Sequence, residues 1–515
     1  MKMTDSADKQ HIPDTRRDLR LLAIDHIFSQ SMVVLTGGAF MVGLVLAMGG
    51  DKWTIGIIAA IGPLCQMAQI PAIYLVQTLR RRRLITVAGA WIARLLFLLV
   101  ALIPWILPAT LQIPALLLII VAHCLLASIS GCAYGSWMRD VVPERVLGRH
   151  MGKRLAVAIG VGAVLSLVVA MAAGLDVTTK ALGPILPYSL IFALAGVLGV
   201  IGTYHLGGVH DPGLPKMPLA SPWALIQRPL MSRSFRMVLI FMGTWAFAQN
   251  LALPFFAVYM FERLGLSLGV VVGLTVMTQL INVALFPIWG ALADRFSNKA
   301  VIGASGLVLV ISFLFWPIMT LDAAPLTGGE AQGGVATGFY WATWPLLIIA
   351  HVVLGVATSG VALAAGNLAL KAAPRGEATA FLATNALVTG LGAAISPLLA
   401  GFLGDYFTGR VLRVSLTWFE TSLTEPLNLP AFDLRGLDFL FVIAFFAGLY
   451  ALHRLTAVTE KGEVEEAVVF AELKIALRRS VFSVVGPSGG VTRLVTIPTG
   501  AAIRTAQRLS KGLGR

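Results

Sequence analysis

Charged residues are scarce in this chain of 515 residues. Asp, Glu, Lys and Arg together make up 12% of the sequence, whereas hydrophobic residues make up 57% and the mean hydropathy is +0.84. A large water-soluble domain needs a polar surface, and this composition does not supply one. The shortage of charge therefore argues against a soluble enzyme and favours a protein that a lipid bilayer solvates.

Cysteines are few, and they lie at Cys65, Cys124 and Cys132. All three fall within apolar stretches, so we predict that they pack as small apolar side chains and form no disulfide framework. The sequence also has no recognisable metal-binding cluster, nucleophile triad or phosphate-binding loop. We therefore expect no enzymatic activity, no cofactor and no metal site.

Carboxylates are missing from the centres of the apolar stretches. Asp25 is shallow, because it follows Arg20 by only five residues. We favour a pair between Asp25 and Arg16, Arg17 or Arg20 at the membrane interface. A proton-coupled carrier commonly needs a buried group that titrates, and the sequence offers four candidates for it. These are Asp25, His26, His123 and His351.

Long apolar stretches are what the sequence has in abundance. About 20 apolar residues cross ~30 Å of hydrocarbon, because backbone polar groups there must be satisfied within a helix. Twelve stretches qualify, so the predicted fold class is an all-α membrane protein with twelve transmembrane helices. They cover 21–47, 53–78, 84–106, 114–137, 155–174, 187–206, 235–260, 267–292, 299–321, 342–368, 377–403 and 437–456.

The basic residues gather on one side of this predicted topology. The net charge is +14, and most cations outside the C-terminal tail fall in loops that would share one face, such as Arg80–Arg83. This bias predicts that both termini lie in the cytoplasm, in a bacterial-type inner membrane. We therefore attribute the positive charge to topology and expect no nucleic-acid partner.

The chain reads as two similar halves. The fourth and tenth spans both end shortly before a proline, at Pro143 and Pro374, and basic residues follow both the second and the eighth span. We predict two pseudo-symmetric six-helix bundles with flanking cytoplasmic segments. The expected parts are an N-terminal tail (1–20), a first bundle (21–206), a linker (207–234), a second bundle (235–456) and a basic amphipathic C-terminal tail (457–515).

The loop after the eighth span resembles a signature of the major facilitator superfamily (MFS). Gly290, Asp294, Arg295 and Lys299 match the signature, whereas Ser297 and Asn298 depart from it. In the first half, Gln77 stands at the aspartate position, so only the basic cluster of the signature is present there. That cluster comprises Arg80, Arg81, Arg82 and Arg83.

The resemblance implies a gating role for this loop. Asp294 at a helix end can accept hydrogen bonds from a facing helix N-terminus and from Arg295. In the family, such a latch holds the cytoplasmic side closed in one conformation and breaks in the other. The alternative is a turn whose charges only fix the topology.

The resemblance also implies a solute cavity lined by the first, fourth, seventh and tenth spans. Polar side chains in those spans are the candidates for binding or coupling, although polar side chains also join helices in membranes. The candidates are Asp25, His26, Gln30, His123, Tyr134, Trp245, Gln249, Asn250 and His351.

Arg94 is a further candidate, because it is a permanent cation about 15 Å into the third span. If no acid lies beside it, an anionic solute would best balance its charge. The alternative is a structural arginine that bonds to Gln66, Gln69 or backbone carbonyls.

We interpret the chain as a secondary transporter that moves a small organic solute by alternating access, with an anionic substrate and proton coupling as open options. The alternative is a scaffold or assembly factor that has the fold but transports nothing. We expect a monomer, whose C-terminal tail lies on the anionic lipids of the inner leaflet.

Overall fold

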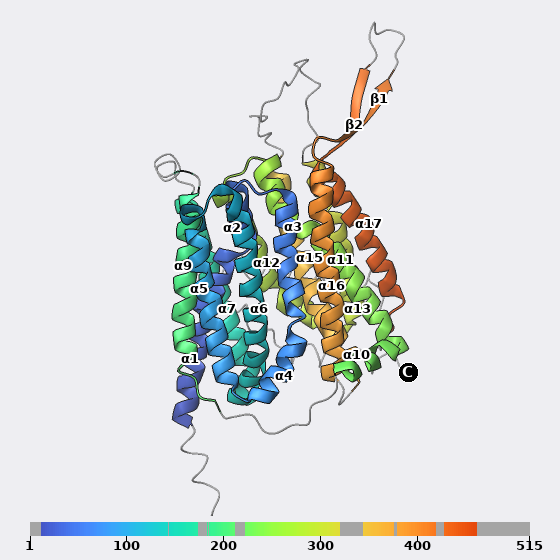
Figure 1. The fold of residues 1–515 in the computed structure, drawn as a ribbon. Coiled ribbons are helices and arrows are strands. Elements are labelled where there is room, and N and C mark those ends of the chain that lie inside the picture. The colour runs from blue at the N-terminus through green and yellow to red at the C-terminus, as the bar shows by residue number, and fades with distance from the viewer. Residues whose placement is uncertain are drawn as a thin grey trace, which may run out of the picture.

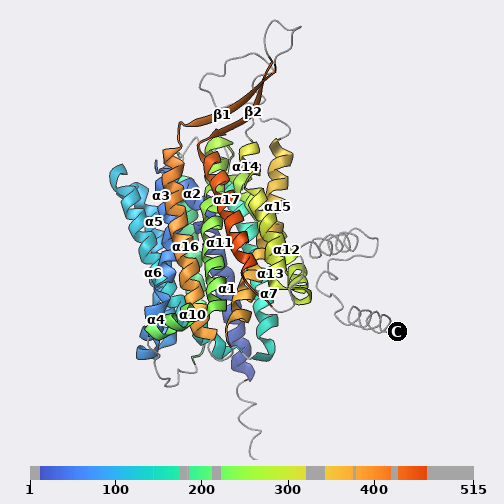
Figure 2. The same cartoon turned by 90° about the vertical axis from the view of Figure 1, so that its right-hand side faces the viewer.

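The computed structural model describes residues 12–142, 144–173, 183, 185–211, 222–319, 343–374, 378–418 and 427–460. Most of them form helices that run side by side (Figures 1 and 2). The helices are α1 (Ile12–Thr36), α2 (Gly38–Ala47), α3 (Lys52–Gln66), α4 (Gln69–Leu79), α5 (Arg82–Ile106), α6 (Ala109–Val141), α7 (Glu144–Ala173), α9 (Leu186–Leu206), α10 (Pro222–Met231), α11 (Arg233–Val258), the π-helical turn η1 (Tyr259–Arg263), α12 (Leu268–Arg295), α13 (Asn298–Ser312), α14 (Phe315–Ile318), α15 (Thr343–Ala372), α16 (Ala378–Tyr406) and α17 (Leu437–Thr456).

Ten spans among the described residues are long and apolar enough to cross a bilayer. A bent pair of helices, Lys52–Gln66 and Pro71–Leu79, would make an eleventh, and Val157–Ala173 is a shorter apolar helix within α7. The protein is therefore an integral membrane protein. The arrangement of twelve spans in two bundles stays a prediction.

The first span is a broken helix, where the sequence predicted a continuous one. α1 ends at Thr36 and α2 begins at Gly38, whose φ of +51° lies in the left-handed region that favours glycine. The helix also starts earlier than predicted, at Ile12, within the segment that we took for an N-terminal tail.

The second span is also broken, between α3 and α4, with a bend of 47°. Pro71 lies near the start of α4 and has no N–H to donate to the carbonyl of Met67, so the hydrogen-bond ladder cannot run through this point. The two prolines of this span, Pro63 and Pro71, explain why 53–78 is not one straight helix.

Packing within the first half joins α1 to α7 and α9, and α5 to α6 and α9. In the second half, α11 packs on α16 and α17, and α15 packs on α12 and α13. The largest contacts between helices of different halves are α3 with α16 and α7 with α12. The predicted linker is partly helical, because α10 lies within it and packs on α16.

The prediction of an all-α protein is wrong for the loop after the eleventh span. Strands β1 (Val411–Trp418) and β2 (Leu427–Arg435) form an antiparallel hairpin that projects beyond the helices (Figure 1). The register shifts between Val414 and Ser415, opposite Phe432 and Pro430, which is where a strand tolerates proline.

We call this end of the molecule the hairpin end, and the opposite end, which carries Arg80–Arg83 and Asp294, the basic end.

Candidate functional site

Arg94 on α5 lies at the centre of a buried polar cluster. Its Nη1 lies 3.1 Å from Asp25 Oδ1 on α1 and donates to Gly199 O at 2.8 Å and to Thr203 Oγ1 at 2.6 Å, both on α9. Its Nη2 donates to Ser29 Oγ at 2.7 Å, and that hydroxyl donates to Asp25. The side chains of Arg94 and Asp25 are 11% and 6% exposed.

This geometry corrects two expectations. Asp25 pairs with Arg94, not with Arg16, Arg17 or Arg20 at the interface. Arg94 therefore has a fixed acid beside it, and the argument that an anionic solute must balance its charge loses its premise. Of the partners we had considered for Arg94, a backbone carbonyl is present, that of Gly199.

Two glycines of α9 make room for this ion pair. A Cβ on Gly202 would lie 3.0 Å from Arg94 Nη1 and 3.2 Å from Asp25 Oδ1, and a Cβ on Gly199 would lie 3.1 Å from Arg94 Cβ. Sequence reasoning missed both, because small residues at i and i+3 favour close helix approach but do not show which side chain of another helix they face.

Tyr134 and His26 extend the polar cluster toward the basic end. Arg154 on α7 donates to Tyr134 Oη on α6 at 2.9 Å. His26 follows Asp25 on α1 and lies within electrostatic range of both Asp25 and Arg154. Five helices of the first half, α1, α5, α6, α7 and α9, thus contribute polar groups to one region, and Arg154 is a member that the sequence analysis did not single out.

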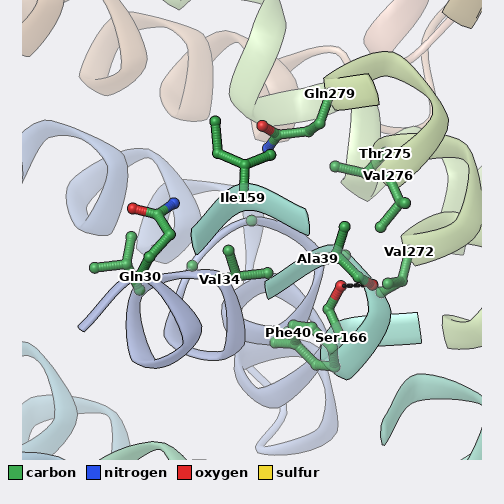
Figure 3. Close-up of a pocket in the computed structure, with 14 residues that line it drawn as sticks. Gln30, Val34, Ala39, Phe40, Ile159, Ser166, Val272, Thr275, Val276 and Gln279 are labelled. Carbon is green, nitrogen blue, oxygen red and sulfur yellow. Dashed lines mark hydrogen bonds between the residues drawn. The ribbon is translucent and has the colours of Figure 1, made fainter. Parts of the chain in front are cut away.

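A cavity of about 260 Å³ opens beside this region, between α1, α2, α7 and α12 (Figure 3). Its polar lining consists of Gln30, Ser166, Thr275 and Gln279, and apolar side chains such as Val34 and Ile159 form the remainder. Figure 3 shows Gln30 and Gln279 on different helices, with Ile159 between them. We call this space cavity one.

A second cavity, of about 420 Å³, lies between α1, α2, α3, α5, α6 and α11. His123 lines it, with its Nδ1 at 2.8 Å from Ala93 O and its ring 4.3 Å from that of Phe97. Val33, Gly37 and Gly38 line both spaces. The break between α1 and α2 is therefore a shared wall of cavity one and this cavity two.

The hairpin end joins the two halves directly. Lys52 Nζ lies 3.1 Å from Glu262 and donates to Thr408 at 3.2 Å, and the N–H of Trp53 donates to Asp405 at 2.9 Å. Glycines allow the backbones to touch, because a Cβ on Gly56 would lie 3.1 Å from the Cα of Gly401. This end of the molecule is closed.

Asp51 starts α3 at the closed end, outside the membrane-spanning segments. Its Oδ1 accepts from the N–H of Thr54 at 2.8 Å and from the Thr54 hydroxyl at 2.6 Å. Burial by itself would raise the pKa of Asp51, but these hydrogen bonds outweigh it and lower the pKa below its ordinary value. The carboxylate is thereby held charged as the N-cap of α3.

No protein-family model matches the chain, and no curated protein matches it in sequence. Solved structures match it in fold. The nucleoside transporter NupG (D323A mutant) has a TM-score of 0.63 at 10% identity, with 87% of this chain and 100% of that chain covered. A D-xylose–proton symporter gives 0.57 at 14% identity, covering 88% and 99%. A bacterial homologue of the iron transporter ferroportin, in an inward-facing state, gives 0.57 at 14%, covering 86% and 98%.

The chain has the major facilitator fold. Within this fold, the cavities depart from the lining that the resemblance implied. α7 and α12 line cavity one, and α3 and α5 contribute to cavity two, in addition to the predicted first, fourth and seventh spans.

The candidates in the second half of the fold bond mainly within their own helices. Trp245 Nε1 donates to Gln249 at 3.0 Å, Asn250 donates to Ala246 O at 2.8 Å, and His351 Nδ1 lies 2.9 Å from Leu347 O. His351 is buried against the Trp316 ring. These four candidates line neither cavity one nor cavity two.

Among the described residues the latch contacts predicted for Asp294 are not formed, and its gating role stays a prediction. Asp294 is exposed and has no hydrogen bond or ion pair within the described residues, while the Arg295 guanidinium lies over the Phe296 ring, 4.9 Å from its centroid. A Cβ on Gly290 would have only the side chain of Leu363 within 4 Å, at 3.8 Å, so no close helix approach requires glycine here. The expected bonds from Arg295 and a facing helix to Asp294 are absent from this part of the chain.

Carboxylates that the sequence analysis overlooked bind the starts of α5 and α13 in the same way. Asp211, just beyond α9, accepts from Arg82 Nη2 at 3.5 Å and from the N–H of Arg83 at 3.4 Å. Glu460, just beyond α17, accepts from Asn298 Nδ2 at 2.6 Å and from the N–H of Lys299 at 2.8 Å.

The match between these two sites extends further. Arg83 also donates to Gly207 O, just after α9, and Lys299 Nζ donates to Thr456 O at 3.2 Å, at the end of α17. In each site, a basic side chain therefore bonds to the end of the helix that precedes the carboxylate. The strings Val209-His-Asp211 and Val458-Thr-Glu460 were the readable signal for this duplication. Arg80 and Arg81 precede α5, and Arg80 adopts a positive φ at the end of α4.

Proposed function

We propose that the protein is a secondary transporter that moves a small organic solute by alternating access. The observation that carries this proposal is the position of the two cavities. They flank a break in the first span, and cavity one lies between helices of both sequence halves. Broken helices at the interface of two repeats are where transporters commonly bind solutes.

The closed hairpin end supports a conformation in which the two halves meet at that end. Two hydrogen bonds and one ion pair join the two halves at that end, and each involves Lys52 or Trp53. We infer that the hairpin end faces outward and that solute exchanges at the basic end in this state. The charge asymmetry supports cytoplasmic termini in a bacterial-type inner membrane.

The cavity linings favour an uncharged, partly polar solute. Among the described residues, no Asp, Glu, Lys or Arg lines cavity one or cavity two, whereas amide and hydroxyl groups of Gln30, Thr275 and Gln279 line cavity one. Such groups fix the orientation of a ligand by hydrogen bonds within an otherwise apolar site. An anionic solute would be desolvated here without a cation to pair with.

The test is counterflow in proteoliposomes with labelled nucleosides, D-xylose and small peptides, the classes that the names of the structural neighbours suggest. Gln30→Leu and Gln279→Leu should each raise the solute concentration at half-saturation by about tenfold, since one buried hydrogen bond to a solute is worth about 1–2 kcal/mol. Gln66→Leu is the matched control, because Gln66 is exposed and lines neither cavity. Exchange of no solute in the panel would favour the scaffold alternative.

Proton coupling is a second element of the proposal, and the buried Asp25 and Arg94 pair is its candidate. Protonation of Asp25 would release its charge from Arg94, which changes the contacts between α1, α5 and α9. Asp25→Asn should then abolish accumulation driven by a pH gradient while counterflow per folded molecule is kept, because exchange requires no net proton movement. Equal loss of both activities would remove Asp25 from the coupling step.

A further inference from the structure

A third cavity, of about 290 Å³, lies at the hairpin end, away from the two central cavities. Its wall is built from the start of α3, from η1, from the segment that follows α16, and from the base of the hairpin where α17 begins. Four basic side chains and one acid line it. They are Lys52, Arg263, Arg410, Arg435 and Glu262.

The charges of this wall do not balance. Four cations against one carboxylate leave a net charge of +3. Glu262 is engaged with Lys52 at 3.1 Å, and the nearby Asp438 accepts the N–H of Arg435 at 2.9 Å. Arg263 and Arg410 have no carboxylate partner within the described residues, and the Arg410 guanidinium lies 3.8 Å from the centroid of the Tyr406 ring.

The shape of the wall is held from below. Tyr259 is fully buried and donates its hydroxyl to Trp316 O at 2.8 Å, so the floor of the cavity is fixed. Thr408, Gly409 and Arg410 are exposed, so the cavity opens to water. Guanidinium groups present planar forks that match the oxygens of carboxylate, phosphate or sulfate.

We propose that this cavity binds a compact oxyanion and that the bound anion holds the hairpin end closed. Lys52 comes from the first half of the chain, whereas Arg263, Arg410 and Arg435 come from the second half. An anion that contacts both sets binds best when the halves meet, so it shifts the population toward the closed hairpin end. The stabilisation of the closed hairpin end by the anion rests on the proposed alternating-access function, whereas the binding site itself does not.

The experiment is a thermal-shift titration of the purified full chain with sodium phosphate, compared with sodium chloride at equal ionic strength. Phosphate should give a saturable rise in Tm that chloride does not give. The double variant Arg263→Gln/Arg410→Gln should bind phosphate at least tenfold more weakly, and Lys52→Gln should do the same. Glu262→Gln should bind it more tightly, because it removes the competing acid. Arg413→Gln is the control, since Arg413 is a hairpin cation that does not line the cavity.

The outcomes separate the parts of the proposal. An equal response in the double variant and in Arg413→Gln, or no saturable response, would overturn the site. Loss in the double variant but not in Lys52→Gln would overturn the bridging of the two halves. Repeating the titration in vesicles with and without phosphatidylglycerol identifies the source, because competition by anionic vesicles means that a lipid headgroup supplies the oxyanion. None of these readouts requires transport, so a failure of the proposed function would not be mistaken for a failure here.

Discussion

At the scale of single residues, the pairing of Asp25 with Arg94 dominates the first half. Both side chains are largely buried, and Arg94 also donates to two neighbouring hydroxyls and to the carbonyl of Gly199. Removing one partner of a buried ion pair leaves an uncompensated charge, whereas removing both does not.

We predict that Arg94→Gln lowers the free energy of unfolding by about 3 kcal/mol, because Asp25 stays buried without its cation. The double variant Asp25→Asn/Arg94→Gln should recover at least half of that loss. Thermal unfolding of the purified variants measures both. Additive losses in the double variant would mean that the two side chains contribute independently.

Gly202 provides a second test at this scale. Gly202→Ala places a methyl group 3.0 Å from Arg94 Nη1 and should displace the guanidinium, lowering Tm by several degrees. Gly160→Ala on α7 is the control, because its Cβ meets nothing within 4 Å; it should leave Tm unchanged or raise it. Similar responses of the two variants would show that the cluster is loosely packed.

At the scale of elements, the contact between α3 and α16 defines the closed hairpin end. A Cβ on Gly404 would lie 3.4 Å from the Cβ of Lys52, close to the ~3.8 Å that separates Cβ atoms across a disulfide. We predict that Lys52→Cys/Gly404→Cys, in a chain whose three native cysteines are replaced by alanine, oxidises readily.

The cross-linked protein should lose counterflow, and reduction should restore it. Band shifts on a non-reducing gel measure the cross-link, and each single cysteine variant serves as control. Full transport by the oxidised form would show that the hairpin end does not need to open.

The duplicated carboxylates give the second prediction at this scale. Glu460→Ala and Asp211→Ala each remove acceptors from two donors at the start of α13 or α5, so each should lower the free energy of unfolding by about 1–3 kcal/mol. Asp294→Ala is the control, because this exposed acid has no partner within the described residues. The free energy of unfolding of this variant should be unchanged. A destabilised Asp294→Ala would instead point to a contact made in another conformation.

At the scale of the whole molecule, the two ends differ in charge and in contacts. The basic end carries Arg80–Arg83, and the hairpin end carries the contacts between the halves. Reporter fusions placed after residue 20 and after residue 515 should both report cytoplasm, because cations are retained on that side. A fusion inserted between β1 and β2 should report the outside, and a cytoplasmic hairpin would invert the proposed topology.

The sequence by itself determined the membrane class. Charge scarcity and long apolar stretches require helices that satisfy their own backbone groups in lipid, and this requirement is local, so it can be read from residue order. The basic clusters predicted an orientation for the same reason. The candidate Arg94 could also be identified, because a cation within an apolar stretch is conspicuous wherever it packs.

Only the tertiary structure decided which groups meet. Asp25 and Arg94 are 69 residues apart, and Arg94 reaches Gly199 across 105. Lys52 meets Thr408 across 356 residues. Such contacts depend on the packing of helices that residue order does not specify, so the sequence assigned Asp25 to the wrong arginine. It also missed Glu460, because a motif records residue types in a loop but not the helix end that comes to lie against it.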